Sequence, residues 1–468
     1  MVPYFPRKIA SNAIVTYLIS LAIVSVVFFR YMMLWGYIVL GITWVLAFFL
    51  LTVKWSVEWR TVSEKNFLKY LFQSALIIRL VWVVTSYFFY LSWTGLPFEF
   101  DAHDAMGYHE EAKWLAGSDW SMTWDYYFGS QFHGTSDVGY PLYLTIIYKI
   151  FGPVIIIPRI IKAFLSAYTC VLMYKLTTRT VNEDMGRLAG IMTCLMPNLV
   201  IYCGYHLKET EMIFLMVLFL ERADHMLRAA KINFWDVLWP SLLALSLFFF
   251  RTVLGAAAGF ALATSVLFSN TSSMKRGVRR VTLVGWGILA VFVFGGGTIM
   301  TELESYWEDR GDNLALRRYE QTARGNQWAQ YATGTVMAPM IFVLPFSTMV
   351  NVSQQYAQQA KHSGNYVRNF MGFFVLLAIY ESFRRKQWRN LILPGSFVIA
   401  YLGVVSLSGF SSSERFLLPG LPMLIILWTY GITTLRKQTF KYLPYWCVVV
   451  VLMEVGWAYF KLGSRGLF

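Results

Sequence analysis

The sequence predicts an all-α polytopic integral membrane protein with about 13 transmembrane helices. Hydrophobic residues make up 57% of the 468 residues and charged residues only 14%, well below the roughly one quarter that is typical of soluble domains. Apolar runs of about 20 residues, each long enough to cross a hydrocarbon core roughly 30 Å thick as a helix, recur along the whole chain. Helices rather than a barrel are therefore expected to span the membrane.

The spans can be placed from the apolar runs. They cover residues 10–29, 33–53, 69–92, 155–177, 186–204, 209–227, 236–250, 252–269, 281–300, 366–384, 391–408, 416–434 and 443–462. We expect the first to be an uncleaved signal anchor, because it lacks a small-residue cleavage site and a second span follows at once. We expect a break at Arg251, because one continuous helix from 236 to 269 would invert the topology of everything after it.

The net charge of +14 is spread over short loops, which indicates membrane topology rather than nucleic-acid binding. With a cytoplasmic N-terminus, every inner loop is basic. The residues concerned are Lys54, Arg60, Lys65, Lys69, Arg179, Arg187, Arg228, Lys231, Lys275, Arg276, Arg279, Arg280, Arg384, Arg385, Lys386, Arg389, Arg436, Lys437 and Lys441. This orientation leaves two long outer loops, at 93–154 and 301–365.

The first outer loop is the strongly acidic part of the chain. Between residues 93 and 140 a single Lys113 faces eight carboxylates: Glu99, Asp101, Asp104, Glu110, Glu111, Asp119, Asp125 and Asp137. The loop is also rich in Trp and Tyr, which suits short amphipathic helices in the headgroup layer. The second loop mixes acidic and basic residues and then reads "NVSQQYAQQAKHSGN", which we expect to form a water-exposed cap.

The stretch "FDAHDAMGYHEEA" at 100–112 carries the first candidate site. In a helix, the spacing of three and four would put Asp101, Asp104, Tyr108 and Glu111 on one face. Alternatively, one aspartate caps the helix and the other residues form a solvated face. A divalent metal held by Asp101, His103, Asp104 and His109 is a further possibility, because carboxylates and imidazoles suit several ions, but no zinc spacing is present.

Cations at the expected outer ends of spans form the second candidate site. They are Arg159, Lys162, Lys208, Arg251 and Arg415. Each could be a snorkelling or ion-paired residue. Together they lie at one depth and face one acidic loop, which favours an anionic substrate. A basic residue at this end of a span is costly unless it has an anionic partner or a function.

Three stretches spread over most of the chain carry a family resemblance. They are "DAMGYHEEAKWLAG", "DVGYPLYLTIIYKIFG" with the later "GYHLKETE", and "SERFLLPGLPMLIILWTYGI". In this order they resemble the polytopic GT-C glycosyltransferases, and within them the bacterial group related to protein O-mannosyltransferases and the lipid A aminoarabinose transferase. The resemblance implies a polyprenyl-phosphate-linked sugar donor, a hydroxyl acceptor, and a catalytic aspartate in the first outer loop.

By its spacing to Tyr108, the resemblance gives the role of general base to Asp104, with Asp101 as the second candidate. Ala105 follows Asp104 where some relatives have an Asp-Glu pair. We expect the cations named above, together with Tyr108, His109 and Glu209, to bind the substrate and its donor phosphate, because positive charge stabilises a departing phosphate. The resemblance implies inversion at the sugar, no obligatory cofactor and a bacterial inner membrane with the active site on the extracytoplasmic side.

The resemblance also gives the expected organisation of the chain. Residues 1–60 would be N-terminal helices added to the family core, 61–300 the catalytic core with the acidic loop, 301–365 the second outer loop and 366–468 the C-terminal helices. Two other functions stay open: an oligosaccharide polymerase or ligase using a diphosphate-linked glycan, and a transporter of lipids or small molecules. A transporter should place charges near the middle of spans, whereas the charges noted here fall at outer ends.

Overall fold

The computed structural model describes residues 4–100, 102–129, 138–229, 231, 233–268, 340–352, 355–407, 413–463 and 467. Regular structure in these residues is helical, apart from one isolated bridge between Met32 and Val350. The longer helices are α1 (Arg7–Val27), α2 (Trp35–Glu58), α3 (Glu64–Thr94), α4 (His103–Ala116), α6 (Gly139–Phe151), α7 (Ile156–Thr180), α8 (Glu183–Leu195), α10 (Glu209–Arg228), α11 (Phe234–Phe250), α12 (Thr252–Phe268), α15 (Tyr356–Arg384), α16 (Ile392–Leu407), α18 (Leu421–Thr434) and α20 (Leu443–Gly463). The all-α prediction is confirmed.

Several shorter helices link or extend these. They are η1 (Phe29–Tyr31), α5 (Trp120–Phe128), α9 (Pro197–Ile201), η2 (Tyr202–Gly204), η5 (Trp388–Leu391), α17 (Glu414–Leu417), η6 (Leu418–Gly420) and α19 (Lys437–Phe440). Within the described part, seven helical stretches are long and apolar enough to cross a membrane, or eight if the bent pair α8 and α9–η2 is one span. Each expected span coincides with a helix or a broken helix, except 281–300, which lies outside the described residues. The total of about thirteen spans therefore stays a prediction.

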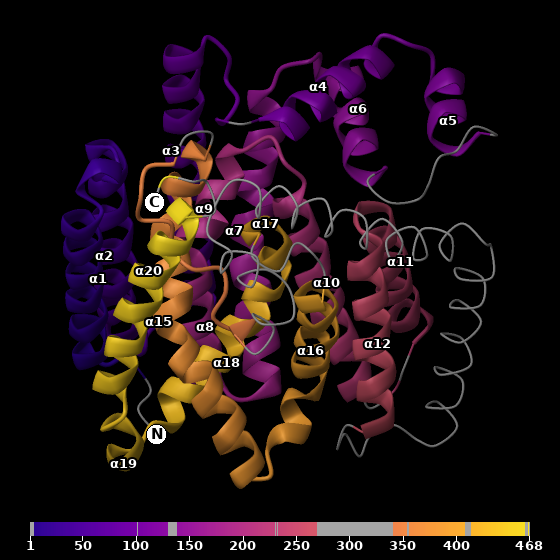
Figure 1. Cartoon of the computed structure of the whole chain (residues 1–468). Coiled ribbons are helices and arrows are strands. Elements are labelled where there is room, and N and C mark those ends of the chain that lie inside the picture. Colours follow the sequence, from indigo (N-terminus) through magenta and orange to yellow (C-terminus); the bar gives the residue numbers. More distant parts are fainter. Residues whose placement is uncertain are drawn as a thin grey trace.

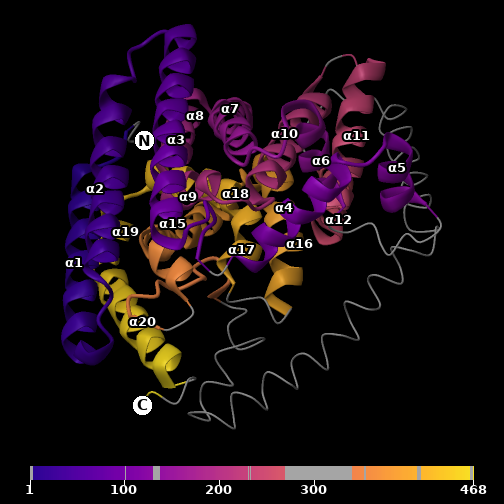
Figure 2. The ribbon, with the colours of Figure 1, turned by 90° about the horizontal axis from the view of Figure 1, so that it is seen from above.

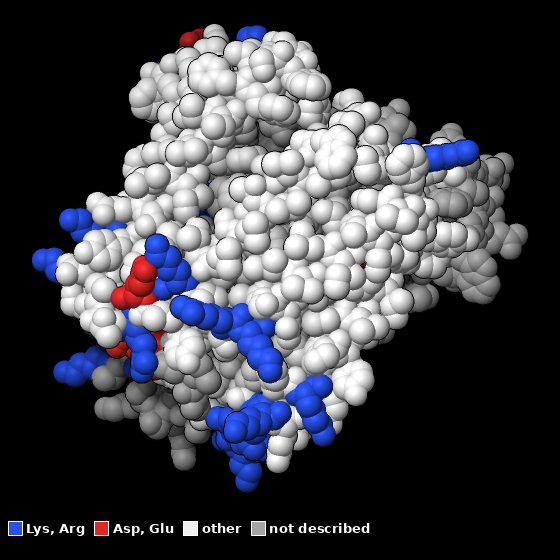
Figure 3. Space-filling model, turned by 90° about the vertical axis from the view of Figure 1, so that its left-hand side faces the viewer, with Lys and Arg blue, Asp and Glu red and all other residues white. Residues whose placement is uncertain are grey.

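The bundle has two chemically different ends. Helices α4, α5 and α6 lie across one of them, at the top of Figure 1, and we call this the loop end. At the opposite, basic end, Arg179 pairs with Glu221 and Asp224, and Arg436 with Glu381. Figure 3 shows one face on which most visible Lys and Arg side chains lie in the lower half, below a broad uncharged surface. This separation matches the predicted distribution of charge between loops.

Helix α18 forms the centre of the bundle. All of its side chains are buried, as expected for a helix that is apolar all round, and it packs against α8, α15 and α16. Seen from above, α1 and α2 lie on one side of this centre and α11 and α12 on the other (Figure 2). At the loop end of the bundle, the ends of α3, α7 and α10 surround the segment that joins η2 to α10.

The fifth expected span is broken rather than straight. The chain bends by 54° between α8 and the helical turns that start at Pro197. Proline has no N–H to donate to the carbonyl of Thr193, one turn earlier. Arg79 donates to the carbonyls of Thr193 (3.2 Å) and Cys194 (3.1 Å) instead. The carbonyls at the break therefore have donors inside the protein, and the bend brings residues 205–208 to the loop end as irregular backbone.

Arg79 corrects one expectation from the sequence. It lies in the middle of the long span α3 and its side chain is fully buried, so charged residues are not confined to the outer ends of spans. A buried ionisable residue inside a span needs partners, and the backbone carbonyls of α8 supply them. Arg79 thus supports the broken helix and gives no indication of a transport path.

The break expected at Arg251 is confirmed. Helix α11 ends at Phe250, Arg251 has extended backbone angles, and α12 begins at Thr252. Lys208 donates a hydrogen bond of 3.1 Å to the carbonyl of Phe250. The turn therefore fixes both cations close to the start of α10.

The amphipathic helices expected in the first outer loop are also confirmed. Helix α3 ends at Thr94 and is followed by Gly95, whose φ of +76° is costly for other residues. The chain then forms α4, α5 and α6. Trp114, Trp120, Trp124 and Tyr126 are exposed, as suits aromatic side chains in a headgroup layer. The three helices cover the ends of the spans and carry Asp104 on their inner side.

Candidate active site

Asp104 lies in the first turn of α4 and forms an ion pair with Arg415 of α17. Arg415 also pairs with Glu209, the first residue of α10. The side chain of Asp104 is 59% exposed, that of Arg415 20% and that of Glu209 0%. Three elements far apart in the sequence therefore meet at the boundary between the loop end and the buried core.

Arg251 joins this group from the break between α11 and α12. Its guanidinium lies 3.8 Å from the Glu209 carboxylate, donates to the Tyr401 hydroxyl at 3.3 Å and stacks on the Phe416 ring at 4.4 Å. We call Asp104, Glu209, Arg251 and Arg415 the carboxylate–arginine cluster. Oε2 of Glu209 is buried without a hydrogen-bond partner among the described residues.

Tyr108 and Lys208 lie beside the cluster. Burial raises the pKa of Tyr108, and the neighbouring Arg415 opposes this shift, so the phenol stays protonated and can donate a hydrogen bond. Burial, reinforced by Arg251, holds the pKa of Lys208 well below its usual value. Asp104 and Tyr108, which the helical spacing puts on one face, thus both reach the same guanidinium. Glu111 instead accepts a hydrogen bond of 3.1 Å from Tyr127 of α5.

Lys361 and Glu414 form an adjoining ion pair that the sequence did not suggest. Lys361 Nζ lies 3.1 Å from the Glu414 carboxylate and 3.2 Å from the Tyr202 hydroxyl. Helix α15 begins at Tyr356, so residues 356–365 of the expected second outer loop are helical and only 11% of the Lys361 side chain is exposed. Glu414 directly precedes Arg415 in the motif "SERFLLPG", and this adjacency is the feature of the sequence that could have indicated the ion pair.

Arg159 and Lys162 lie in a separate buried group. Arg159 donates to the carbonyl of Pro97 at 2.6 Å and lies 4.0 Å from Glu99. Lys162 donates to the carbonyls of Tyr205 (3.0 Å) and Leu207, and lies 3.7 Å from Glu211. Both side chains are fully buried. Lys162 holds the irregular segment before α10 against α7, and Arg159 holds the segment that follows α3 against the same helix. Their predicted contact with a donor phosphate stays a prediction.

His109 belongs to the same buried group. Its Nδ1 is 2.8 Å from the Tyr148 hydroxyl, which is also 3.2 Å from Nε2 of His206. Burial lowers the pKa of both imidazoles, that of His206 strongly. The chain His109–Tyr148–His206 joins α4 to α6 and to the segment before Lys208, so it positions Asp104 relative to Glu209.

The proposed metal ligands do not gather at one point within the described chain. No group of three His, Cys, Asp or Glu side chains there could hold an ion. Asp104 pairs with Arg415, His109 contacts Tyr148 and His103 is exposed. Asp101 lies outside the described residues, so its part in a metal site or in catalysis is a prediction.

Comparisons with known proteins were made for the sequence and for the fold. No family model matches the sequence, and no curated protein matches it. Among solved structures, the chain is similar to the Archaeoglobus fulgidus oligosaccharyltransferase tethered to an acceptor peptide with an NVT sequon, with a TM-score of 0.45 and 12% identity over 88% of this chain and 56% of that one.

A second structure of the same oligosaccharyltransferase, a complex with Zn and sulfate, is similar with a TM-score of 0.41 and 11% identity over 85% of this chain and 53% of that one. This chain therefore spans about half the length of the matched chains. At TM-scores below 0.5, the similarity carries no conclusion about the fold or function of this chain.

Proposed function

We propose that the protein is a membrane glycosyltransferase that moves a sugar from a polyprenyl-phosphate-linked donor to a hydroxyl acceptor. The observation that carries the proposal is the carboxylate–arginine cluster at the loop end. It combines a water-accessible carboxylate, Asp104, with two guanidinium groups at the ends of membrane-spanning helices. Transfer of a sugar from a lipid-linked phosphate requires both kinds of group: a base for the acceptor and cations for the leaving phosphate.

Arg415 and Arg251 are the proposed phosphate ligands. Guanidinium groups match the geometry of phosphate oxygens and remain charged when partly buried. Asp104 and Glu209 contact the guanidinium of Arg415 at positions where phosphate oxygens could bind. A donor phosphate would displace the exposed Asp104 rather than the buried Glu209, because exposed ion pairs are weak. The displaced carboxylate would then be free to act on the acceptor.

The proposed reaction is a single displacement. The acceptor oxygen attacks the anomeric carbon while its proton passes to the Asp104 carboxylate, as general-base catalysis requires. The bond between the anomeric carbon and the phosphate oxygen breaks, and the electron pair leaves with the polyprenyl phosphate. Arg415 and Arg251 stabilise the added negative charge in a site with little water. The configuration at the anomeric carbon is inverted, and the step balances without a nucleotide or redox partner.

The proposed orientation puts the loop end on the extracytoplasmic side, in a bacterial inner membrane. The support is the opposite end, where the basic residues of the short loops gather, since positively charged loops are retained in the cytoplasm. The cluster would therefore meet donor lipids and acceptors in the outer leaflet.

The test of this proposal is donor cleavage by the purified protein in nanodiscs. A panel of undecaprenyl-phosphate-linked hexoses and pentoses, tritiated in the sugar, is incubated with candidate hydroxyl acceptors, and sugar released from the lipid is counted. Asp104→Asn should lower the rate about 10²-fold or more, the range lost with a general base. Glu110→Gln, an exposed carboxylate of the same helix, is the matched control and should keep full activity.

Three outcomes would change the proposal. Full activity of Asp104→Asn together with an inactive Asp101→Asn would transfer the base to residue 101. Activity with diphosphate-linked oligosaccharides alone would favour a polymerase or ligase. Failure of the wild type to cleave either lipid class, with binding of neither, would refute a glycosyltransferase.

A further inference from the structure

A half-open apolar groove lies at the loop end of the membrane-spanning bundle. Its volume is about 750 Å³, within the roughly 300–1,000 Å³ of ligand sites. Its walls come from the start of α2, the second half of α3 and the start of α15. Aromatic side chains dominate the lining, among them Tyr37, Trp82, Phe89, Trp93, Phe100 and Tyr356.

The depth of the groove corresponds to one leaflet. From Trp82 to Trp93, α3 rises about 16 Å at 1.5 Å per residue, close to half of a hydrocarbon core roughly 30 Å thick. The residues that line it from α2 are the first of that helix, Gly36 to Leu40. The groove is therefore confined to the half of the membrane nearer the loop end, which is the side of the carboxylate–arginine cluster.

Residues of the groove wall lead directly to the charged site. Tyr90 packs against Phe100 with ring centroids 5.3 Å apart and against Tyr205 at 6.4 Å. Tyr205 in turn lies 5.9 Å from the ammonium group of Lys361. Lys361 follows Ala360, which lines the groove, and it pairs with the residue before Arg415. A cation thus stands between the inner end of the groove and the cluster.

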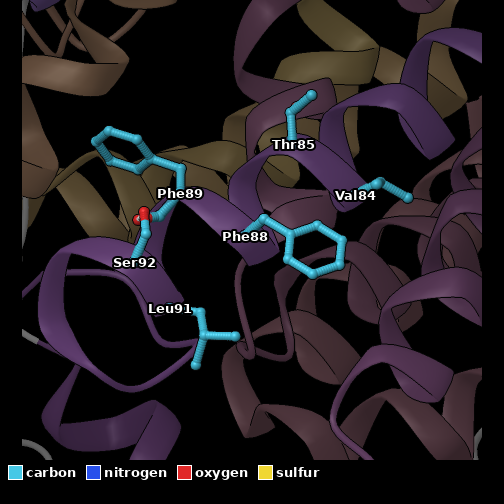
Figure 4. A pocket seen from close by; sticks show the side chains of 6 residues that line it. All are labelled: Val84, Thr85, Phe88, Phe89, Leu91 and Ser92. Carbon is cyan, nitrogen blue, oxygen red and sulfur yellow. Dashed lines mark hydrogen bonds between the residues drawn. The ribbon is translucent and has the colours of Figure 1, made fainter.

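A second hollow on α3 shows what a weaker site looks like. It has a volume of about 610 Å³ and shares Thr85 and Phe89 with the groove. All six side chains that line it come from α3 (Figure 4). A single helix offers no opposite wall, so a chain lying there would remain in contact with membrane lipid. Helix α2 is what turns the neighbouring surface into a two-sided groove.

We propose that this groove binds the prenyl chain of the lipid-linked donor, and that the N-terminal helix α2 provides one of its walls. The inference rests on the proposed function, because it takes the phosphate of the same lipid to lie at the cluster. We choose a prenyl chain rather than the acyl chain of a bilayer phospholipid because a largely buried cation, Lys361, lies behind the groove wall beyond Tyr90 and Tyr205. A bilayer phospholipid keeps its phosphate in the headgroup layer, whereas a bound substrate can place one beside Lys361 and Arg415.

Gly36 offers a way to fill the groove without disturbing the fold. A Cβ atom at Gly36 would meet no other atom within 4 Å, so Gly36→Trp places an indole in the groove. Gly456 of the spanning helix α20 is open in the same sense and does not line the groove, so Gly456→Trp is the matched control. Leu40→Trp is a second blocking variant at a lining position, should Gly36→Trp express poorly.

The experiment measures binding of two probes, undecaprenyl phosphate and the short geranyl phosphate, to protein in nanodiscs by native mass spectrometry. Wild type should bind the long probe more tightly than the short one. Gly36→Trp should weaken binding of undecaprenyl phosphate about tenfold or more, through lost burial of apolar chain, and leave geranyl phosphate unchanged. Gly456→Trp should alter neither. A photoreactive group near the end of the long probe should label peptides that contain residues 34–40 or 82–93.

The outcomes separate this inference from the proposed function. Binding of both probes with equal affinity, unaffected by Gly36→Trp and without labelling of α2 or α3, would overturn the groove assignment and leave the glycosyltransferase standing. Competition by phosphatidylglycerol at equal concentration would show that the groove holds bilayer lipid and would also overturn it. Binding of neither probe to wild type would count against the proposed function itself.

Discussion

The ion pairs of Arg415 make a quantitative prediction about stability. The Glu209 side chain is fully buried and Arg415 contacts it directly, while Arg251 lies 3.8 Å away. Arg415→Gln removes the nearer cation and leaves a buried carboxylate with one more distant partner. Breaking a buried pair from one side costs about 3–5 kcal/mol. We therefore expect Arg415→Gln to lower the free energy of unfolding by about 3 kcal/mol or more.

Two further variants test the reasoning. Glu209→Gln in the Arg415→Gln background removes the stranded charge, so the double variant should recover part of the loss, with a coupling energy of about 0.5–3 kcal/mol. Asp104→Asn should cost less than about 1 kcal/mol, because the Asp104 side chain is 59% exposed and exposed ion pairs contribute little. The same guanidinium thus serves one structural pair and one weak pair.

The assay is denaturant unfolding in detergent micelles, followed by tryptophan fluorescence. Wild type, Arg415→Gln, Glu209→Gln, the double variant and Asp104→Asn are measured under identical conditions. Additive effects of Arg415→Gln and Glu209→Gln would refute the direct pairing. A cost for Asp104→Asn as large as that for Arg415→Gln would show that Asp104 is a structural residue. It would then be a poor candidate for the catalytic base.

Three further predictions follow from buried groups. Arg79→Met should cost roughly 2–5 kcal/mol in unfolding experiments, because the carbonyls at the α8 break lose their donors. Burial lowers the pKa values of His109 and His206, so on acidification the unfolded chain takes up protons before the folded protein does. The free energy of unfolding should therefore be highest above about pH 6.5. Below that pH it should fall by up to about 1.4 kcal/mol per pH unit for each histidine. Thermal melts from pH 7.5 to 5 check this, with His109→Asn/His206→Gln giving a flatter profile. Gly364→Ala should lower the melting temperature, because its Cβ would collide with the Asn198 side chain and lie 3.0 Å from that residue's backbone nitrogen.

The sequence predicted the helices well because membrane insertion makes simple demands. An apolar run of sufficient length must form a helix in lipid, since its backbone polar groups have no other partners. Even the break at Arg251 followed from counting loops and charges. The bend at Pro197 was not predicted, because the whole of 186–204 is apolar and a proline is tolerated in a span whose neighbours supply donors.

The partners of the cations could not be predicted from residue type alone. Lys162, Lys208 and Arg79 donate to backbone carbonyls at chain breaks or irregular segments, whereas Arg415 pairs with carboxylates. Both kinds of partner suit a buried cation, and the carbonyls become available only once the helices bend. Lys361 was missed for a related reason: its polar neighbours suggested a surface loop, whereas tertiary packing buries it beside Glu414.

The pairing of Asp104 with Arg415 gives the proposed reaction an order. While Arg415 holds Asp104, the guanidinium occupies the carboxylate oxygen that would accept the proton of the acceptor. A donor phosphate that takes over Arg415 moves this cation onto the leaving group. The same event therefore frees the carboxylate oxygen and places a cation on the leaving group, so an acceptor hydroxyl reaches that oxygen only after the lipid has bound.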